Sequence, residues 1–149
     1  YNMTDLQASL GIHQIKKLEG FIKKREKIAQ FYNKSFKDTP EIVTPVARKH
    51  VKHARHLYSI LLDLDTLKID RNQFFIALDA ENIGASVHFI PVHLHPYYAE
   101  KFGFKRGDYP NAEYVYDRII SLPLNPTLTL KEAGQVVKAV KKIINYYRK

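Results

Sequence analysis

The sequence predicts a single domain of the α+β class, with two layers and a long first helix packed on a small sheet. Three observations support this prediction. Apolar residues recur three or four positions apart from Ala8 to Tyr32, which is typical of one face of a long helix. The segment from His56 to Leu64 is almost continuously apolar, as in a strand covered on both faces. The predicted helices and strands alternate irregularly, which disfavours a doubly wound parallel sheet.

Two capping boxes predict where the first and last helices begin. The Thr4 hydroxyl can accept from the backbone N–H of Gln7 while the Gln7 side chain reaches back, so a helix is expected from Thr4 to about Phe36. Thr129 and Glu132 repeat this pattern before the last helix. The buried stripe of that last helix is expected to comprise Val136, Val137, Val140, Ile143, Ile144 and Tyr147.

Shorter elements are expected between these two helices. A loop containing the segment 40–45 follows the first helix, and a short helix capped by an aspartate spans 70–82. A helical turn is expected at 97–102, and a helix opened by a proline at 110–120. The segment 121–124 is expected to be extended.

A second strand is expected from Ser86 to Ile90. In an extended chain, Val87 and Phe89 point to one face and His88 points to the other. Pro91 lacks a backbone donor and therefore ends the strand or confines it to an edge. These positions place His88 at a strand end, where a side chain can face a cleft. From the residues alone, a structural role for His88 stays open beside a functional one.

Composition describes an ordinary globular protein. Hydrophobic residues make up 45% of the 149 residues and charged residues 26%, so the chain should fold. No apolar run approaches the roughly 18 residues of a membrane span, and the N-terminus lacks a signal-peptide pattern. The sequence contains no cysteine, which excludes disulfides and thiolate catalysis. We therefore expect a cytoplasmic protein with no membrane partner.

The formal net charge of +9 raises nucleic acid as a possible partner. The basic residues instead follow two predicted helices as solvated faces do, and no nucleic-acid-binding motif accompanies them, so no nucleic-acid partner is expected. The residues concerned are Lys16, Lys17, Lys23, Lys24, Arg25 and Lys27 on the first helix, and Lys138, Lys141, Lys142, Arg148 and Lys149 at the C-terminus.

The histidines invite a metal site, because imidazole binds zinc and nickel. His50, His53 and His56 are spaced three apart, and His93 and His95 form a second group. The first three lie in no helical pattern that would align them, and no carboxylate completes a tetrahedral set. We therefore predict no metal site. Paired carboxylates, a nucleophile elbow, a phosphate loop and a dinucleotide fingerprint are also missing, so no catalytic residue is assigned.

Several segments occur in a specific order and spacing. They are Tyr1-Asn2-Met3-Thr4-Asp5-Leu6-Gln7-Ala8, Leu10-Gly11 with Gln14 and Leu18, His56-Leu57-Tyr58, Ile83-Gly84, Val87-His88-Phe89-Ile90-Pro91-Val92-His93, Pro96-Tyr97-Tyr98, Gly107-Asp108-Tyr109-Pro110-Asn111-Ala112-Glu113 and Ser121-Leu122-Pro123-Leu124. With these segments the whole chain resembles the C-terminal part of the DegT/DnrJ/StrS family of pyridoxal-phosphate-dependent nucleotide-sugar aminotransferases.

The resemblance implies a fold of the aspartate aminotransferase type, in which residues 1–149 are the small C-terminal domain and the large cofactor-binding domain is absent. The family's Schiff-base lysine lies in that large domain. The parent is expected to be a homodimeric enzyme of polysaccharide biosynthesis that transfers an amino group, usually from glutamate, to a keto sugar attached to a nucleotide. This chain alone is expected to be inactive and to bind no pyridoxal phosphate.

By motif, Asn2 matches a family position near the cofactor phosphate of the partner subunit, and His88 matches a histidine that faces the active site. His93, Tyr97 and Tyr98 are candidates for the edge of the substrate pocket. The alternative hypothesis is a stand-alone basic binding or regulatory module, which the net charge and the missing cofactor domain would favour.

Overall fold

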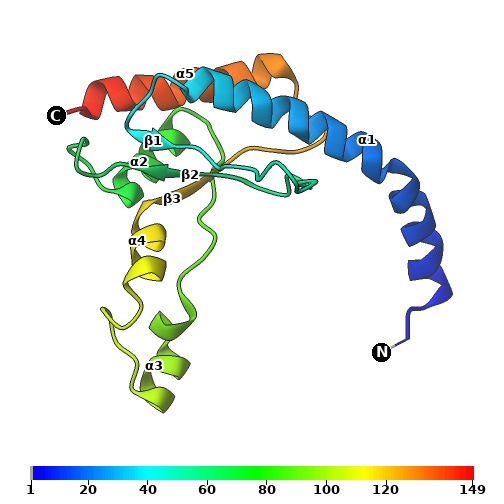
Figure 1. Cartoon of the computed structure of the whole chain (residues 1–149), viewed down its shortest axis with the longest axis horizontal. Coiled ribbons are helices and arrows are strands. Elements are labelled where there is room, and N and C mark those ends of the chain that lie inside the picture. The colour runs from blue at the N-terminus through cyan, green and yellow to red at the C-terminus, as the bar shows by residue number, and fades with distance from the viewer. Residues whose placement is uncertain (1) are drawn as a thin grey trace.

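The computed structural model describes residues 2–149, so Tyr1 of the opening motif lies outside the described residues. Figure 1 shows helices above a small central sheet and an arm that projects away from it. The elements in chain order are α1 (Asp5–Phe36), β1 (Ile42–Val43), β2 (Tyr58–Leu62), α2 (Arg71–Ala80), the 3-10 helix η1 (Val92–Leu94), α3 (Pro96–Phe102), α4 (Pro110–Arg118), β3 (Ile119–Leu122) and α5 (Leu130–Tyr147).

The sheet has three antiparallel strands in the order β1-β2-β3. Tyr58 pairs with Leu122, and Ile60 with Ile120, and all four side chains are buried. The apolar run expected at 56–64 thus contains the central strand. Its burial alternates, because Ser59 and Leu61 are only partly covered.

The second layer consists of α5 and the C-terminal half of α1, which lie side by side above the sheet (Figure 1). The Tyr32 ring lies 4.9 Å from the Tyr58 ring, and the Tyr32 hydroxyl donates to the Pro123 carbonyl at 3.0 Å. The Tyr58 hydroxyl donates to the Asn33 side chain at 2.7 Å, so both buried tyrosines satisfy their polar ends. The predicted α+β class, with a long first helix on a small sheet, is confirmed.

Both predicted capping boxes are present at α1 and α5, but two element assignments were wrong. The strand expected at Ser86–Ile90 is only an isolated bridge between Ser86 and Ser121. The chain leaves the sheet directly after that bridge. Because residues 87–90 form no strand, the predicted alternation of Val87 and Phe89 with His88 between two faces does not apply. The helix expected at 110–120 ends at Arg118, because Ile119 and Ile120 pair with β2. The short strand β1, between the two prolines of the 40–45 loop, was not predicted.

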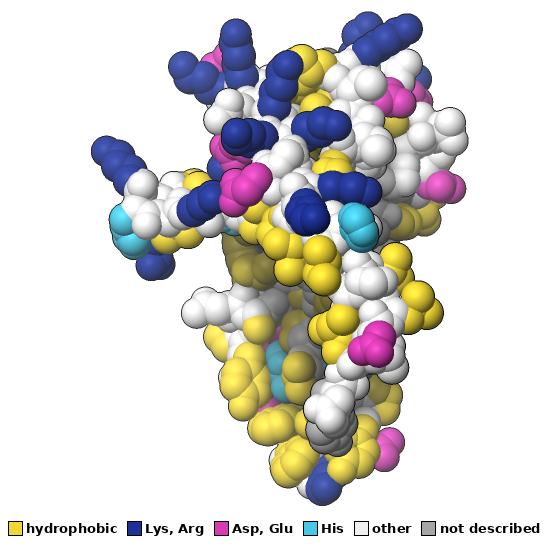
Figure 2. Space-filling model, turned by 90° about the vertical axis from the view of Figure 1, so that its right-hand side faces the viewer, with side chains coloured by type: hydrophobic (Ala, Val, Ile, Leu, Met, Phe, Trp, Pro, Cys, Tyr) yellow, Lys and Arg dark blue, Asp and Glu magenta, His cyan; other side chains and the backbone are white. Residues whose placement is uncertain are grey.

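Residues 87–118 form the arm, which contains η1, α3 and α4 and projects below the sheet in Figure 1. Gly103 ends α3 in the left-handed region with φ 70°, a conformation that glycine adopts without a steric penalty. Figure 2 shows that lysine and arginine side chains gather on the upper part of the molecule, whereas hydrophobic side chains dominate the lower part.

The N-terminal half of α1 extends beyond the core (Figure 1). The buried residues of this helix all belong to its last third, from Ile28 onward. Ile12, Ile15 and Leu18 are 56%, 71% and 45% exposed, so the apolar stripe is covered only where α1 meets the rest of the domain. Among the described residues, no helix is both long enough and apolar enough to span a bilayer.

Candidate functional site

His88 lies at the root of the arm, where the chain leaves the sheet, and is half-buried. Its Nδ1 is 3.0 Å from the Ser121 hydroxyl on β3, and that hydroxyl is 2.8 Å from the hydroxyl of Ser59 on β2. Ser59 and Ser121 are direct partners in the antiparallel register. Two neighbouring strands therefore hold the imidazole through a chain of hydrogen bonds.

The direction of this hydrogen-bond chain sets the His88 tautomer. If Ser121 donates to Nδ1, then Nε2 carries the proton and is a donor; if Nδ1 donates to Ser121, then Nε2 is an acceptor. In residues 2–149, Nε2 of His88 has no hydrogen-bond partner. Either tautomer thus leaves one oriented nitrogen for a ligand. The Phe89 ring packs edge-on against the imidazole at 4.7 Å and is itself 74% exposed.

His93 lies in the interior of the arm, not on an open edge. It is buried, and its Nε2 lies 2.9 Å from a carboxylate oxygen of Glu113. Because a carboxylate only accepts, Nε2 carries the proton. The same carboxylate accepts from the backbone N–H of Gly107 at 2.8 Å and from that of Tyr109. In the Gly107–Glu113 motif, backbone N–H groups of the loop thus donate to the carboxylate of the glutamate that ends the motif.

Glu113 is the most strongly hydrogen-bonded acid of the arm. Burial raises the pKa of its carboxyl, but the hydrogen bonds from His93, Gly107 and Tyr109 together outweigh burial and lower the pKa below its ordinary value of 4.5. Glu113 is therefore ionised near neutral pH. Arg106 lies alongside, 3.9 Å from the carboxylate.

Tyr97 and Tyr98 lie on α3 and are 59% and 39% exposed. Their rings meet edge-on at 5.3 Å, and Lys101 donates to the Tyr97 hydroxyl at 2.7 Å. An aromatic series continues from Tyr98 through Phe102 and Phe104 to Tyr109, which packs on His93. This aromatic series is largely exposed, and Tyr97 and Tyr98 lie on the surface of the arm, where a ring can stack on a ligand.

Asn2 is exposed and precedes α1 in an extended segment. The structure does not bring it together with His88, because the N-terminal end of α1 and the arm lie on opposite sides of the open space below the sheet (Figure 1). Among residues 2–149, no three metal-ligating side chains converge.

The residues that hold the two arm histidines were not predicted from the sequence. Ser59 and Ser121 position His88, and Glu113 positions His93. The sequence does mark these positions. Each serine is flanked by large apolar residues in a strand, and Glu113 is the last residue of the Gly107–Glu113 segment that carries the family resemblance. No pattern in the sequence, however, pairs a given serine with a given histidine.

Comparison with known proteins gives consistent matches. An uncharacterized protein of Methanocaldococcus jannaschii, MJ1066, is 55% identical over 148 residues, which cover 99% of this chain and 38% of that protein. The spore coat polysaccharide biosynthesis protein SpsC of Bacillus subtilis is 45% identical over 144 residues, covering 96% of this chain and 37% of SpsC.

A solved structure shows the same fold. PseC of Helicobacter pylori, an aminotransferase involved in the biosynthesis of pseudoaminic acid, superposes with a TM-score of 0.89 at 28% identity, covering 99% of this chain and 39% of PseC. The chain therefore spans well under half the length of the proteins it matches. The model of the DegT/DnrJ/EryC1/StrS aminotransferase family matches residues 1–141, nearly the whole chain. This chain accordingly belongs to the DegT/DnrJ/EryC1/StrS aminotransferase family.

Proposed function

We propose that this chain is the C-terminal small domain of a pyridoxal-phosphate-dependent sugar aminotransferase and that His88 orients the sugar substrate. The parent, a homodimer, transfers an amino group from glutamate to a keto sugar carried on a nucleotide. The observation that carries the proposal is the position of His88: two strands of a family domain hold one ring nitrogen and leave the other without a partner in the described residues.

The exposed apolar surfaces support a place within a larger enzyme. The N-terminal half of α1 and the surface of the arm both present large hydrophobic side chains, and such surfaces usually mark an interface. The family match together with the partial coverage of the relatives favours the cofactor-binding domain as the protein that covers them. These observations favour a domain of a larger aminotransferase over a stand-alone basic module.

Aminotransferases of this family depend on pyridoxal phosphate, which supplies an electron sink for the amino transfer when bound. A lysine that holds it covalently is usually desolvated or lies beside another cation. Every lysine of this chain is exposed, so none has the desolvated setting that favours covalent attachment. We therefore assign this chain no step of the amino transfer. Its part is to bind and orient the sugar, with Nε2 of His88 as donor to or acceptor from a sugar hydroxyl.

The test is the variant His88→Ala in the full-length protein. Loss of one neutral hydrogen bond worth about 1 kcal/mol should lower kcat/KM about fivefold, while the melting temperature stays nearly constant. The matched control is His50→Ala, which removes an exposed histidine from the loop after β1 and should change neither quantity. If His88→Ala unfolds several degrees earlier but keeps full activity per folded molecule, the histidine is structural and the proposal is wrong.

Ser121→Ala separates orientation from contact. It leaves the imidazole in place but removes the hydroxyl that fixes its tautomer, so kcat/KM should fall by a smaller factor than in His88→Ala. Combining both changes should cost no more than His88→Ala alone, because Ser121 acts through the histidine. Additive losses in the double variant would show that Ser121 has no such positioning role.

A further inference from the structure

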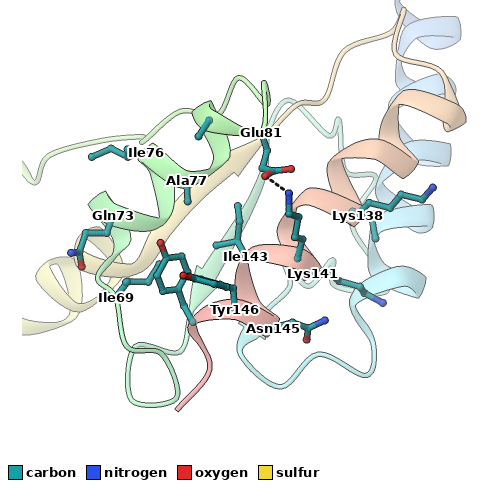
Figure 3. Close-up of a pocket in the computed structure, with 14 residues that line it drawn as sticks. Ile69, Gln73, Ile76, Ala77, Glu81, Lys138, Lys141, Ile143, Asn145 and Tyr146 are labelled. Atoms are coloured by element: carbon teal, nitrogen blue, oxygen red, sulfur yellow. Dashed lines mark hydrogen bonds and ion pairs between the residues drawn. The ribbon is translucent and has the colours of Figure 1, made fainter.

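A groove of about 1150 Å³ runs between α2 and α5, with a largely apolar lining (Figure 3). Ala77 and Ala80 of α2 are small, and this leaves space beside Val137 and Ile143 of α5. The volume exceeds the roughly 300–1,000 Å³ of pockets that hold small molecules. The groove is also open, so it suits a chain segment better than a compact ligand.

The walls of the groove have the geometry of a helix-packing surface. Gln73 and Ala77 of α2 and its C-cap residue Glu81 form one row at a four-residue spacing. On α5, Lys138, Lys142 and Tyr146 form another. Rows at this spacing are the ridges between which a neighbouring helix packs. Among the described residues, those that line the groove come from α2, from α5 and from the chain directly next to α2, so no third helix lies between these ridges.

The rims expose two large hydrophobic side chains. Ile76 on α2 is 66% exposed and Tyr146 on α5 is 76% exposed. Both side chains line the groove, and Figure 3 shows that they come from the two helices that form its walls. An occupant with apolar side chains would remove both from water, which favours binding.

The charges along the groove are basic. Lys142 is paired with Glu81 at 2.6 Å, the contact dashed in Figure 3. Lys138 and Lys141 also line the groove and form no ion pair with any residue in 2–149. The occupant that complements this arrangement carries carboxylates beside its apolar face.

We propose that this groove binds an amphipathic helix with acidic flanks, presented by a partner protein. Its apolar side chains enter between Ile76 and Tyr146, and its carboxylates meet Lys138 and Lys141. A second copy of this chain fits less well, because a two-fold contact would bring the same lysines together. A bilayer surface also fits less well, because membrane-binding helices project apolar side chains, whereas this surface is hollow.

The test uses the 149-residue chain and two fluorescent synthetic peptides of 18 residues. Both peptides place leucine at helical spacing on one face with alanine elsewhere; one carries glutamate on its flanks and the other carries lysine at the same positions. By fluorescence anisotropy, the glutamate peptide should bind at least about tenfold more tightly than the lysine peptide. The Ile76→Glu variant should weaken its binding about tenfold. The double variant Lys138→Glu with Lys141→Glu should reverse the preference between the peptides.

Matched controls lie elsewhere on the chain. Val46→Glu introduces the same charge at a side chain that is 88% exposed but outside the groove, and Lys23→Glu with Lys24→Glu makes the same charge change on α1. Neither should alter the preference. Equal binding of the two peptides, or equal loss in Val46→Glu and Ile76→Glu, overturns the proposal. Two further results would overturn the proposal if the glutamate peptide also fails to bind. One is self-association of the chain that Ile76→Glu abolishes. The other is binding to phosphatidylcholine–phosphatidylglycerol vesicles that Ile76→Glu abolishes.

Discussion

The buried pair of His93 and Glu113 decides the shape of the arm. Glu113 accepts hydrogen bonds from three donors at once, the imidazole of His93 and the backbone N–H groups of Gly107 and Tyr109. Because these donors come from η1 and from the loop before α4, one carboxylate joins segments that have no sheet or long helix between them. The arm is thus held by local chemistry more than by a hydrophobic core of its own.

This pair leads to a pH dependence whose sign follows from the lowered pKa of Glu113. A carboxyl whose pKa is lower in the folded than in the unfolded state stabilises the fold above its ordinary pKa of 4.5, and this stabilisation is lost as the pH falls through the folded-state value. Glu113→Gln should therefore lower the melting temperature by several degrees at pH 7. The difference from the unsubstituted chain should shrink below about pH 4.

Circular dichroism would measure how this difference in melting temperature depends on pH. Thermal melts would be recorded between pH 3 and pH 7 at intervals of about half a pH unit. Glu100→Gln is the matched control, because Glu100 is an exposed glutamate on α3. It should leave the melting curve unchanged. A constant difference between Glu113→Gln and the unsubstituted chain at every pH would contradict the assigned role.

At the scale of elements, α1 and α5 begin with the same capping box but contribute differently to stability. Thr129 and Glu132 cap a helix whose buried face spans its length, from Ala133 to Ile144. Thr4 and Gln7 cap a helix whose first half is exposed. An N-cap stabilises the whole domain only when unfolding the domain also unfolds the capped turn.

The two caps therefore form a matched pair of variants. Thr129→Ala should lower the free energy of unfolding by about 1 kcal/mol, measured by urea denaturation. Thr4→Ala should leave that free energy unchanged while increasing hydrogen exchange in the first turn of α1. Equal losses for both variants would mean that the N-terminal half of α1 belongs to the cooperative core.

At the scale of the whole molecule, charge and apolar surface are segregated (Figure 2). The N-terminal half of α1 exposes Ile12, Ile15 and Leu18, which share one face of the helix at a three-residue spacing. Such a helix lowers its free energy by burying its apolar face against another protein surface. In the isolated chain, the available surface is that of a second copy.

We expect the isolated chain to self-associate at high micromolar concentration in sedimentation velocity experiments. Ile15→Glu with Leu18→Glu should shift it toward monomer without loss of helicity, because both side chains are exposed. Ser9→Glu with His13→Glu adds the same number of carboxylates on the side of α1 opposite Ile15 and Leu18 and should shift the equilibrium much less. A chain that stays monomeric without any substitution would count against α1 as an interface.

The sequence by itself determined the elements whose signals are local. Capping boxes marked the starts of α1 and α5, and the apolar run at 56–64 marked the central strand, because side-chain spacing and N–H satisfaction are properties of neighbouring residues. The ordered motifs likewise identified the family over nearly the whole chain.

Only the tertiary structure decided where these elements meet. The segment at 86–90 has the alternation of a strand, but pairing needs a partner of matching length, and Ser121 offers one bridge before the chain turns into the arm. His88 and His93 look alike in the sequence, yet one is held by Ser121 with a nitrogen left over and the other is buried against Glu113. Hydrogen bonds between residues 20 or 33 positions apart leave no periodic trace in a sequence, because each depends on the path of the intervening chain.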